Sequence, residues 1–263
     1  MVSVEKTQFR FEPIRIFRYV ENYLFAGVKR ILAMSATLTP HFTRTLDIAR
    51  EEQRSYSIPP VFPRKALRVV HVPTAKMVKG VKPPDIEQWL STIDSIIDVH
   101  PADKGIVHTV SYDRGLEIVN RSRHQQKMLF ARQGEFPQAI AQFKLLPPPL
   151  ILVSPAAGVG LDFPDDLCRY QIIAKVPYPD ISNRVVAARL KANPLYASSV
   201  AALALMQACG RATRHHRDFS VVYIVDDSIV YLISRHRRFF SPWWFHYYLG
   251  SRPLSAIISK KKG

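Results

Sequence analysis

The sequence has few cysteines and no long hydrophobic run. Cys168 and Cys209 are the only cysteines among 263 residues. Two cysteines exclude a disulfide scaffold, a four-cysteine zinc site and a self-contained four-cysteine iron–sulfur cluster. No apolar run reaches the roughly 18 residues of a membrane span, and the first residues lack a signal-peptide pattern. We therefore expect a soluble cytoplasmic protein without a metal site of its own and without a membrane partner.

Acidic residues are also scarce. The chain has 37 lysines and arginines against 21 aspartates and glutamates, a formal net charge of +16. With 47% hydrophobic residues the chain can bury a sizeable core, which excludes a disordered basic tail. A charge excess of this size favours a polyanion such as nucleic acid as partner, although an acidic protein would satisfy it too.

Short apolar runs alternate with stretches of helical period. Each run is four to six residues long and almost continuously apolar, as expected of strands buried on both faces. The expected strands are 30–34, 67–72, 105–110, 150–153, 172–176 and 221–225. The expected helices are 41–52, 86–98, 112–126 and 198–209. This alternation predicts an α/β lobe of three layers, a mainly parallel sheet with helices on both faces.

The last part of the chain differs in composition. Four basic residues, 235–238, lead into a cluster of aromatic residues at 239–248. We interpret 1–234 as the α/β lobe and 235–263 as a basic-aromatic C-terminal extension. The extension is expected to pack back on the lobe and bury Trp243 or Trp244.

Two expected strands end in hydroxyl groups. Ser35 and Thr37 follow the run at 30–34, and Thr109 and Ser111 follow the run at 105–110. Ligands of open α/β sheets bind at the carboxyl edge, where parallel strands end, and hydroxyl and amide groups at a helix start suit phosphate. Ordinary helix capping explains the same residues.

A glycine-containing loop follows the strand at 150–153. Gly158 and Gly160 allow a close approach of backbone to ligand, and Asp162 comes two residues later. A dinucleotide-binding loop is the rival interpretation, but the third glycine of GxGxxG would fall at Phe163.

The stretch at 203–218 carries a QxxGRxxR pattern. Gln207 lies near the end of an expected helix, Gly210 ends it, and Arg211 and Arg214 follow three residues apart. Arginine forks neutralise phosphoryl groups during transfer, whereas a solvated basic face is the alternative.

Together and in this order, these stretches resemble the C-terminal motor lobe of a superfamily 2 helicase of the DinG and XPD type. SATL at 35–38 resembles motif III, and HTVSYDR at 108–114 resembles motif IV. The segment 153–179 resembles motif V with the strand after it, and QACGRATR at 207–214 resembles motif VI. The likeness runs from about Phe17 to Trp244, and motif VI with the continuation of motif V is its most specific part.

The resemblance implies a RecA-like fold and a share in an ATP site. Arg211 and Arg214 would be arginine fingers that reach the γ-phosphate of ATP bound with Mg²⁺ mainly by an N-terminal lobe. Gln207 would sense that phosphate. Gly160 and Asp162 would lie near the nucleotide or couple it to the DNA strand.

The resemblance also implies residues for coupling and for single-stranded DNA, along which this family moves from 5′ to 3′. Ser35 and Thr37 would link hydrolysis to movement, and Ser111 and Tyr112 would touch the DNA backbone. Lys175 and Arg184 flank the continuation of motif V and are further candidates for the backbone groove, with a solvated surface as the alternative.

The sequence departs from the family in two ways. Val159 stands where the family has an acidic residue, and neither a GxxxxGK[ST] loop nor a DEAH-like box is present. We therefore expect that the chain hydrolyses ATP only with an N-terminal RecA-like lobe, in cis or in trans. The alternative functions are a non-catalytic module that binds single-stranded nucleic acid and, from the glycine loop alone, an unrelated α/β cofactor enzyme.

Overall fold

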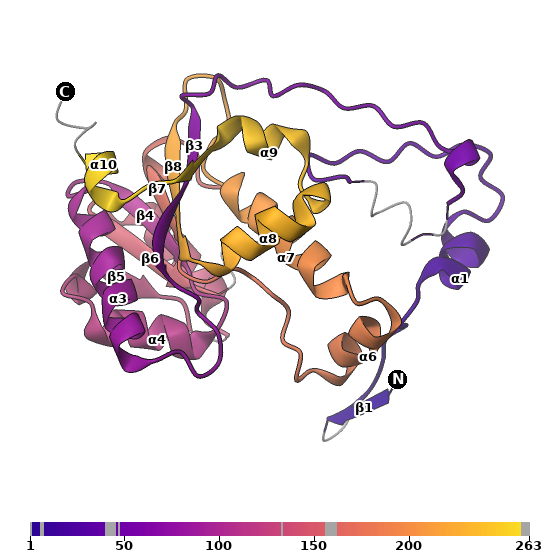
Figure 1. Cartoon of the computed structure of the whole chain (residues 1–263), viewed down its shortest axis with the longest axis horizontal. Helices are drawn as coiled ribbons and strands as arrows, with labels where there is room; N and C mark the ends of the chain where they lie inside the picture. The colour runs from indigo at the N-terminus through magenta and orange to yellow at the C-terminus, as the bar shows by residue number, and fades with distance from the viewer. Residues whose placement is uncertain are drawn as a thin grey trace.

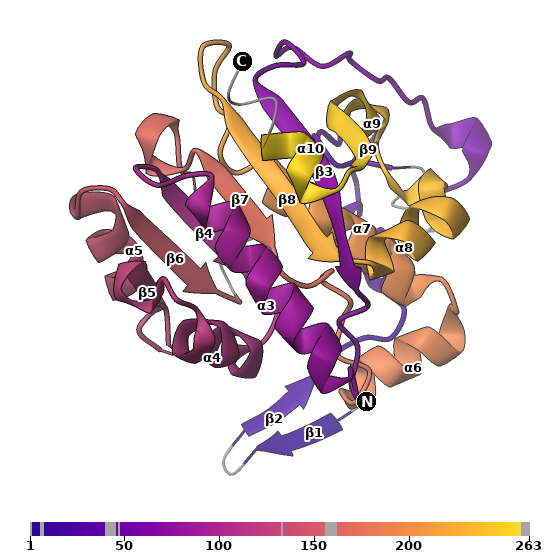
Figure 2. The same cartoon turned by 60° about the vertical axis from the view of Figure 1, so that its left-hand side comes forward.

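A seven-stranded sheet forms the centre of the protein (Figure 2). The computed structural model describes residues 2–5, 8–39, 46, 48–132, 134–155 and 162–258. The strand order is β5-β6-β4-β7-β8-β3-β9, and every neighbouring pair is parallel. The strands are β3 (Leu67–Ala75), β4 (Lys104–His108), β5 (Met128–Phe130), β6 (Leu150–Ser154), β7 (Tyr170–Ile173), β8 (Ser220–Asp226) and β9 (Tyr248–Ser251). The predicted α/β fold with a mainly parallel sheet is confirmed.

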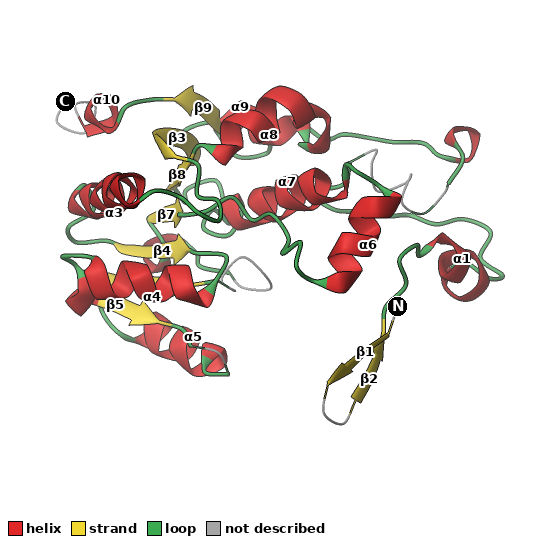
Figure 3. Ribbon diagram, turned by 60° about the horizontal axis from the view of Figure 1, so that its bottom comes forward, coloured by secondary structure: helices red, strands yellow, loops and turns green. Residues whose placement is uncertain are grey.

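Helices cover both faces of this sheet, because its central strands are apolar on both sides. Val69 of β3 belongs to the hydrophobic cluster under α7, α8 and α9, and the next residue, Val70, belongs to the cluster under α3. Figure 3 shows α3 and α10 on one side and α7, α8 and α9 on the other. The helices are α3 (Pro83–Asp98), α4 (Tyr112–Arg121), α5 (Phe136–Leu145), α6 (Arg184–Ala192), α7 (Tyr196–Cys209), α8 (Ser228–His236), α9 (Pro242–Tyr247) and α10 (Leu254–Ile258).

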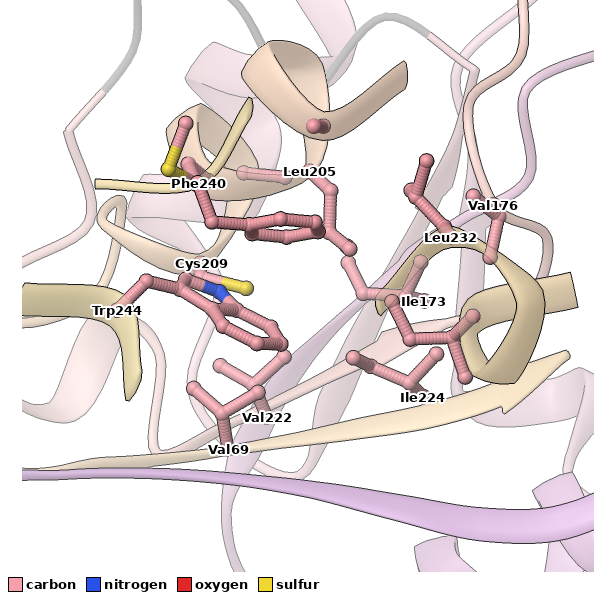
Figure 4. Packing of buried hydrophobic residues seen from close by; sticks show 14 of the residues in the cluster. Val69, Ile173, Val176, Leu205, Cys209, Val222, Ile224, Leu232, Phe240 and Trp244 are labelled. Carbon is pink, nitrogen blue, oxygen red and sulfur yellow. The ribbon is translucent and has the colours of Figure 1, made fainter. Parts of the chain in front are cut away.

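The C-terminal extension is built into the core. Trp244 of α9 is fully buried beside Cys209 and Phe240 (Figure 4), so the predicted packing of the extension on the lobe is confirmed. After α9, β9 adds a seventh strand beside β3. His71 of β3 holds β9 in place. Its Nδ1 lies 2.7 Å from the Ser251 hydroxyl, and its Nε2 lies 2.9 Å from the Asp227 carboxylate. One buried imidazole thus joins β3, β9 and the end of β8.

The N-terminal part lies to one side of the sheet (Figure 1). It holds a hairpin of β1 (Val2–Glu5) and β2 (Gln8–Phe11), then α1 (Phe17–Tyr19), the π-helical turn η1 (Val20–Leu24) and the short η2 (Arg50–Glu52). The prediction of a strand at 30–34 is wrong. These residues pair with no strand of the described chain, and Leu32 and Met34 are each 83% exposed.

The other predicted elements agree with the structure in different degrees. The helices expected at 86–98 and 198–209 are α3 and α7, and the one expected at 112–126 divides into α4 and the short η3 (Gln125–Lys127). The strand expected at 172–176 begins two residues earlier, as β7. Half of the helix expected at 41–52 lies outside the described residues, and the described half holds only the short η2. Within the described ranges, no helix has both the length and the apolar character to cross a membrane.

Candidate functional site

The arginine-rich loop after α7 lies at the amino edge of the sheet, where the strands begin. Helix α7 ends at Gly210, and the loop that follows leads into β8. The hydroxyl of Thr213 donates to the Ala66 carbonyl at 3.2 Å, just before β3. Farther along, the buried Asp218 accepts from the guanidinium of Arg169, just before β7, at 3.0 Å. These contacts fix the loop against the starts of β3 and β7, the two strands that flank β8.

Asp162 joins this loop to the chain that follows β6. Its carboxylate forms an ion pair with the Arg214 guanidinium and lies 4.0 Å from Nη1 of Arg211. Beside it, the amide of Phe163 donates to the Arg211 carbonyl at 3.2 Å. The Asp162 side chain is 62% exposed, whereas the Arg211 side chain is 17% exposed. Burial and the neighbouring charge of Arg214 lower the pKa of Arg211, and Asp162 opposes that shift.

Gln207 lies in the last turn of α7, four residues before Arg211, and is half-buried. A polar relay ties the end of this helix to the sheet. Nε2 of His108 donates to the Gln171 amide oxygen at 2.9 Å, and the Gln171 amide nitrogen donates to the Cys209 carbonyl at 3.4 Å. Burial lowers the pKa of His108 to about 4. The relay therefore connects β4, β7 and α7, the elements of the motif IV, V and VI resemblances.

Three potential metal ligands, which were not predicted from the sequence, lie beside the arginines. They are Asp165, His215 and Asp218. His215 Nε2 lies 3.0 Å from the Asp165 carboxylate. Asp218 accepts from Arg169 and from the amides of Arg214 and Phe219. These hydrogen bonds explain the cluster without an ion.

Ser111 and Tyr112 lie at the opposite, carboxyl edge of the sheet, where β4 leads into α4. Ser111 is the N-cap of α4, and its hydroxyl accepts from the Arg114 amide at 3.4 Å. The Tyr112 ring packs edge-on against Phe130, with 6.3 Å between the ring centroids. Val110 just before them has a φ of 67°, a strained value for a β-branched residue. Strain of this kind is concentrated at functional sites.

Lys175 follows β7 at the same carboxyl edge, and the structure places more lysines beside it. The buried Asp226 accepts from the amides of Met77 at 3.1 Å, Val176 at 2.8 Å and Ser228 at 2.9 Å. One carboxylate therefore holds together the loops that follow β3, β7 and β8. The lysines of the β3 loop were not predicted, although the sequence carries a lysine at every third position there. They are Lys76, Lys79 and Lys82, and all three are exposed.

Arg184 is the exposed first residue of α6, and Asn183 caps that helix. Lys79 and Lys175 are both close enough to Asp180 to contribute to lowering its pKa, after the larger effect of its hydrogen bonds with Ser182. The charges of the β3 and β7 loops are thus neighbours.

Ser35 and Thr37 do not lie at the carboxyl edge, because the segment before them is not part of the sheet. Ser35 is exposed and Thr37 is half-buried, and their hydroxyls lie 3.1 Å apart. The neighbouring backbone contacts the C-terminal extension instead: Trp243 donates to the Ala36 carbonyl, and Ser241 donates to the Leu38 carbonyl at 3.5 Å. Gly160, expected near the nucleotide, lies outside the described residues.

Known helicases match both the sequence and the fold. The Helicase C-terminal domain family matches residues 93–247. The ATP-dependent DNA helicase chl-1 of Caenorhabditis elegans is 37% identical over 93 residues, which cover 32% of this chain and 11% of chl-1. A solved XPD helicase structure has 18% identity and a TM-score of 0.59, covering 90% of this chain and 45% of that one. An apo XPD structure, also 18% identical, has a TM-score of 0.57, covering 84% of this chain and 49% of that one.

The chain thus spans about half the length of the XPD structures it matches. Because the sequence identity to these structures is only 18%, the likeness shows the RecA-like fold and nothing more. The family match covers more than half of the chain and includes β4, β6, β7, α7 and β8 with the loop of Arg211 and Arg214. This chain belongs to the Helicase C-terminal domain family and is a helicase motor lobe of the XPD and DinG type.

Proposed function

We propose that this lobe is the second half of an ATP-dependent DNA helicase, which acts with an N-terminal RecA-like lobe in cis or in trans. ATP with Mg²⁺ is the substrate and is held mainly by the partner lobe. Arg211 and Arg214 act as arginine fingers, and Gln207 senses the γ-phosphate. The observation that carries this proposal is the convergence of both arginines on the single carboxylate of Asp162.

The charges at this point favour an anion. Two guanidinium groups lie against one exposed carboxylate: Arg214 forms an ion pair with Asp162, and Arg211 lies 4.0 Å from the same carboxylate. The shift of the Arg211 pKa shows that burial and Arg214 both disfavour its charged form. A phosphate bound between the two forks would relieve that repulsion with short, charge-assisted hydrogen bonds. Two arginines that served only as solvated surface residues would gain no stability from lying so close together.

The opposite edge of the sheet supplies part of the single-stranded DNA track in this proposal. Ser111 and Tyr112 contribute from the start of α4, Lys175 from the β7 loop and Arg184 from α6. To these we add Lys76 and the other lysines of the β3 loop. The buried Asp226 supports this assignment, because it fixes the β3 and β7 loops side by side and so gathers positive charge along one edge.

The test is ATP hydrolysis by this chain combined with the N-terminal lobe of an XPD-type helicase. DNA-stimulated turnover should appear only when both lobes are present, since the chain has no GxxxxGK[ST] loop. Arg211→Ala and Arg214→Ala should each lower the turnover rate by about 10³–10⁵, the usual effect of removing an arginine finger. Arg123→Ala is the matched control, because Arg123 is an exposed arginine paired with Asp98.

Equal loss of turnover in Arg123→Ala, or normal turnover in Arg211→Ala, would contradict the assignment. Robust hydrolysis by the chain alone would contradict the need for a partner lobe. The alternative function, a non-catalytic module that binds single-stranded nucleic acid, predicts DNA binding without hydrolysis in every combination of lobes.

A further inference from the structure

The C-terminal extension carries a basic surface that the motor-lobe proposal does not use. Arg235 is in the last turn of α8, and Arg237 and Arg238 belong to the short helix η5 (Arg237–Phe239). All three side chains are exposed. Within the part of the chain that the structure describes, none of them forms an ion pair with a carboxylate. Three positive charges within four residues are therefore left for a partner.

Aromatic residues shape this surface. The Arg237 guanidinium stacks on the Phe245 ring, with 3.7 Å between its central carbon and the ring centroid. Beside it is a shallow hollow of about 440 Å³, lined by Arg237, Arg238, Phe240, Pro242 and Phe245. Stacking on a ring holds the guanidinium plane and leaves its edge and its outer face free for hydrogen bonds and for a second stacked group.

The charges of these arginines also act on the neighbouring His236. His236 stacks on Phe239, with ring centroids 5.7 Å apart. Burial lowers the pKa of His236, and the charges of Arg238 and Arg235 lower it further. The two arginines are thus close enough to act on one imidazole and together produce a local positive potential.

This surface lies on a different face of the sheet from the α4 part of the proposed DNA track, which holds Ser111 and Tyr112. Helix α8 packs on the sheet face that α7 covers, whereas α4, which begins at Tyr112, belongs to the other face. Helix α8 starts at the carboxyl edge after β8, and the parallel strand β9 starts level with Val69 near the amino end of β3. The chain in between, with η5 and α9, therefore returns toward the amino edge.

We propose that Arg237, Arg238 and the hollow beside Phe245 form a second binding site for single-stranded DNA, outside the motor track. The edges of the two guanidinium groups bind backbone phosphates. An unpaired base stacks on the outer face of Arg237, which Phe245 supports from below. The net charge of +16 favours a polyanion, and an aromatic-backed guanidinium plane suits a base that is free to stack. An acidic peptide would use the charges but not the stacked plane.

The experiment measures binding of the full chain to a labelled oligothymidylate by fluorescence anisotropy between 50 and 200 mM salt. Arg237→Ala should weaken binding about tenfold, as expected from the loss of one stacked base. The double variant Arg237→Ala/Arg238→Ala should also reduce the slope of log affinity against log salt by about 1.4, since each phosphate contact on a single strand contributes about 0.7. The matched control is Arg121→Ala/Arg123→Ala, which removes the same charge from paired arginines.

An abasic oligonucleotide separates stacking from charge. It should bind the unmodified chain more weakly than oligothymidylate does, and this difference should vanish in Arg237→Ala. Equal binding of the chain to duplex, or displacement of the oligonucleotide by polyglutamate of matched charge, would overturn the proposal and indicate an acidic-protein surface instead. Equal loss of affinity in both double variants would likewise overturn it, as a general effect of net charge.

This inference does not depend on the arginine-finger assignment. If Arg237→Ala/Arg238→Ala binds DNA normally while Lys175→Ala does not, the second site is absent and the proposed track stands. If the lobe pair never hydrolyses ATP but the η5 variants lose affinity, the motor proposal fails and the second site stands.

Discussion

The carboxylate of Asp162 pairs with the guanidinium of Arg214 and so joins the segment after β6 to the loop after α7. The two residues are 52 positions apart in the chain. Arg211 lies within 4.0 Å of the same carboxylate. In the proposed motor, a phosphate of ATP would replace Asp162 as the partner of these arginines, so the carboxylate keeps both forks oriented before the nucleotide arrives.

Replacement of Asp162 by asparagine tests this positioning role. An exposed ion pair usually contributes about 1 kcal/mol or less to folding, so Asp162→Asn should leave the free energy of unfolding almost unchanged. The DNA-stimulated ATPase of the combined lobes should fall about tenfold or more, because misplaced groups are costly in catalysis. Urea denaturation and steady-state turnover provide the two measurements. Asp162→Glu should restore part of the rate, and unchanged turnover in Asp162→Asn would show that the pair has no catalytic role.

Removal of the buried carboxylate of Asp226 should lower the stability of the fold, which Asp162→Asn should leave almost unchanged. Asp226→Ala leaves two buried amides and one partly buried amide without their acceptor, which should lower the free energy of unfolding by roughly 2–4 kcal/mol. The β3 and β7 loops should then separate, and affinity for single-stranded DNA should fall with them.

Chemical denaturation and a DNA titration of the same samples would check this prediction. Asp226→Asn, which keeps the shape of the side chain, should show a smaller loss and serves if Asp226→Ala does not fold. Asp85→Ala, in the first turn of α3, is the control for loss of one carboxylate. If Asp226→Ala destabilises the chain without changing DNA affinity, the lysines of the two loops are not part of the track.

The sequence predicted the centre of the sheet because its strands are apolar throughout. Strands β3, β4, β6 and β8 are buried on both faces, and a continuous apolar run is the signature of that environment. The run at 30–34 has the same composition but no partner in the described sheet, since apolar character does not tell which sheet a strand joins. Strand β9 was overlooked because its short, half-buried sequence YLGS carries no such signal. Its place depends on a distant residue, His71.

The sequence predicted which types of residue form the candidate site, but not how they are arranged in space. The QxxGRxxR pattern drew attention to Arg211 and Arg214, yet only the fold shows that Asp162 meets both. Lys76 and its neighbours were missed for a similar reason. The contact between the β3 and β7 loops depends on Asp226, a buried acid at the end of a third strand, and no local pattern reports it.

His108 should make the stability of the lobe depend on pH. Its pKa is about 4 in the folded chain because burial disfavours the imidazolium, against an ordinary value of 6.5. Between these values the unfolded chain binds a proton that the folded chain does not. The stability present above pH 6.5 is therefore lost as the pH falls toward 4, at up to about 1.4 kcal/mol per pH unit.

The measurement is urea denaturation at several pH values from 7 to 4. His108→Gln should reduce the slope in this window, because an amide can still donate to Gln171 but does not titrate. Carboxylates contribute a background slope, so the comparison is with His246→Gln, which removes an exposed histidine of α9. Equal slopes in the two variants would mean that His108 does not titrate between these limits.

The exposed apolar residues of the N-terminal part should matter for the partner lobe. Ile31 is 51% exposed, and Leu32 and Met34 are each 83% exposed, in an extended stretch that pairs with no described strand. Contiguous apolar surface of this kind marks an interaction site. In the proposed motor, this stretch packs against the N-terminal lobe. The chain alone should therefore bind a hydrophobic dye such as anilinonaphthalene sulfonate, and addition of the N-terminal lobe should suppress that binding.

The double variant Leu32→Asp/Met34→Asp separates this contact from the fold. It should keep the thermal stability of the sheet, since neither side chain enters the core clusters, while it weakens association with the N-terminal lobe at least tenfold. Sedimentation or titration calorimetry of the two lobes measures the effect. Leu145→Asp is the control, because Leu145 is 85% exposed at the end of α5, away from this stretch. Unchanged association in the double variant would show that the partner lobe contacts other surfaces, such as the loop of Arg211 and Arg214, without help from this segment.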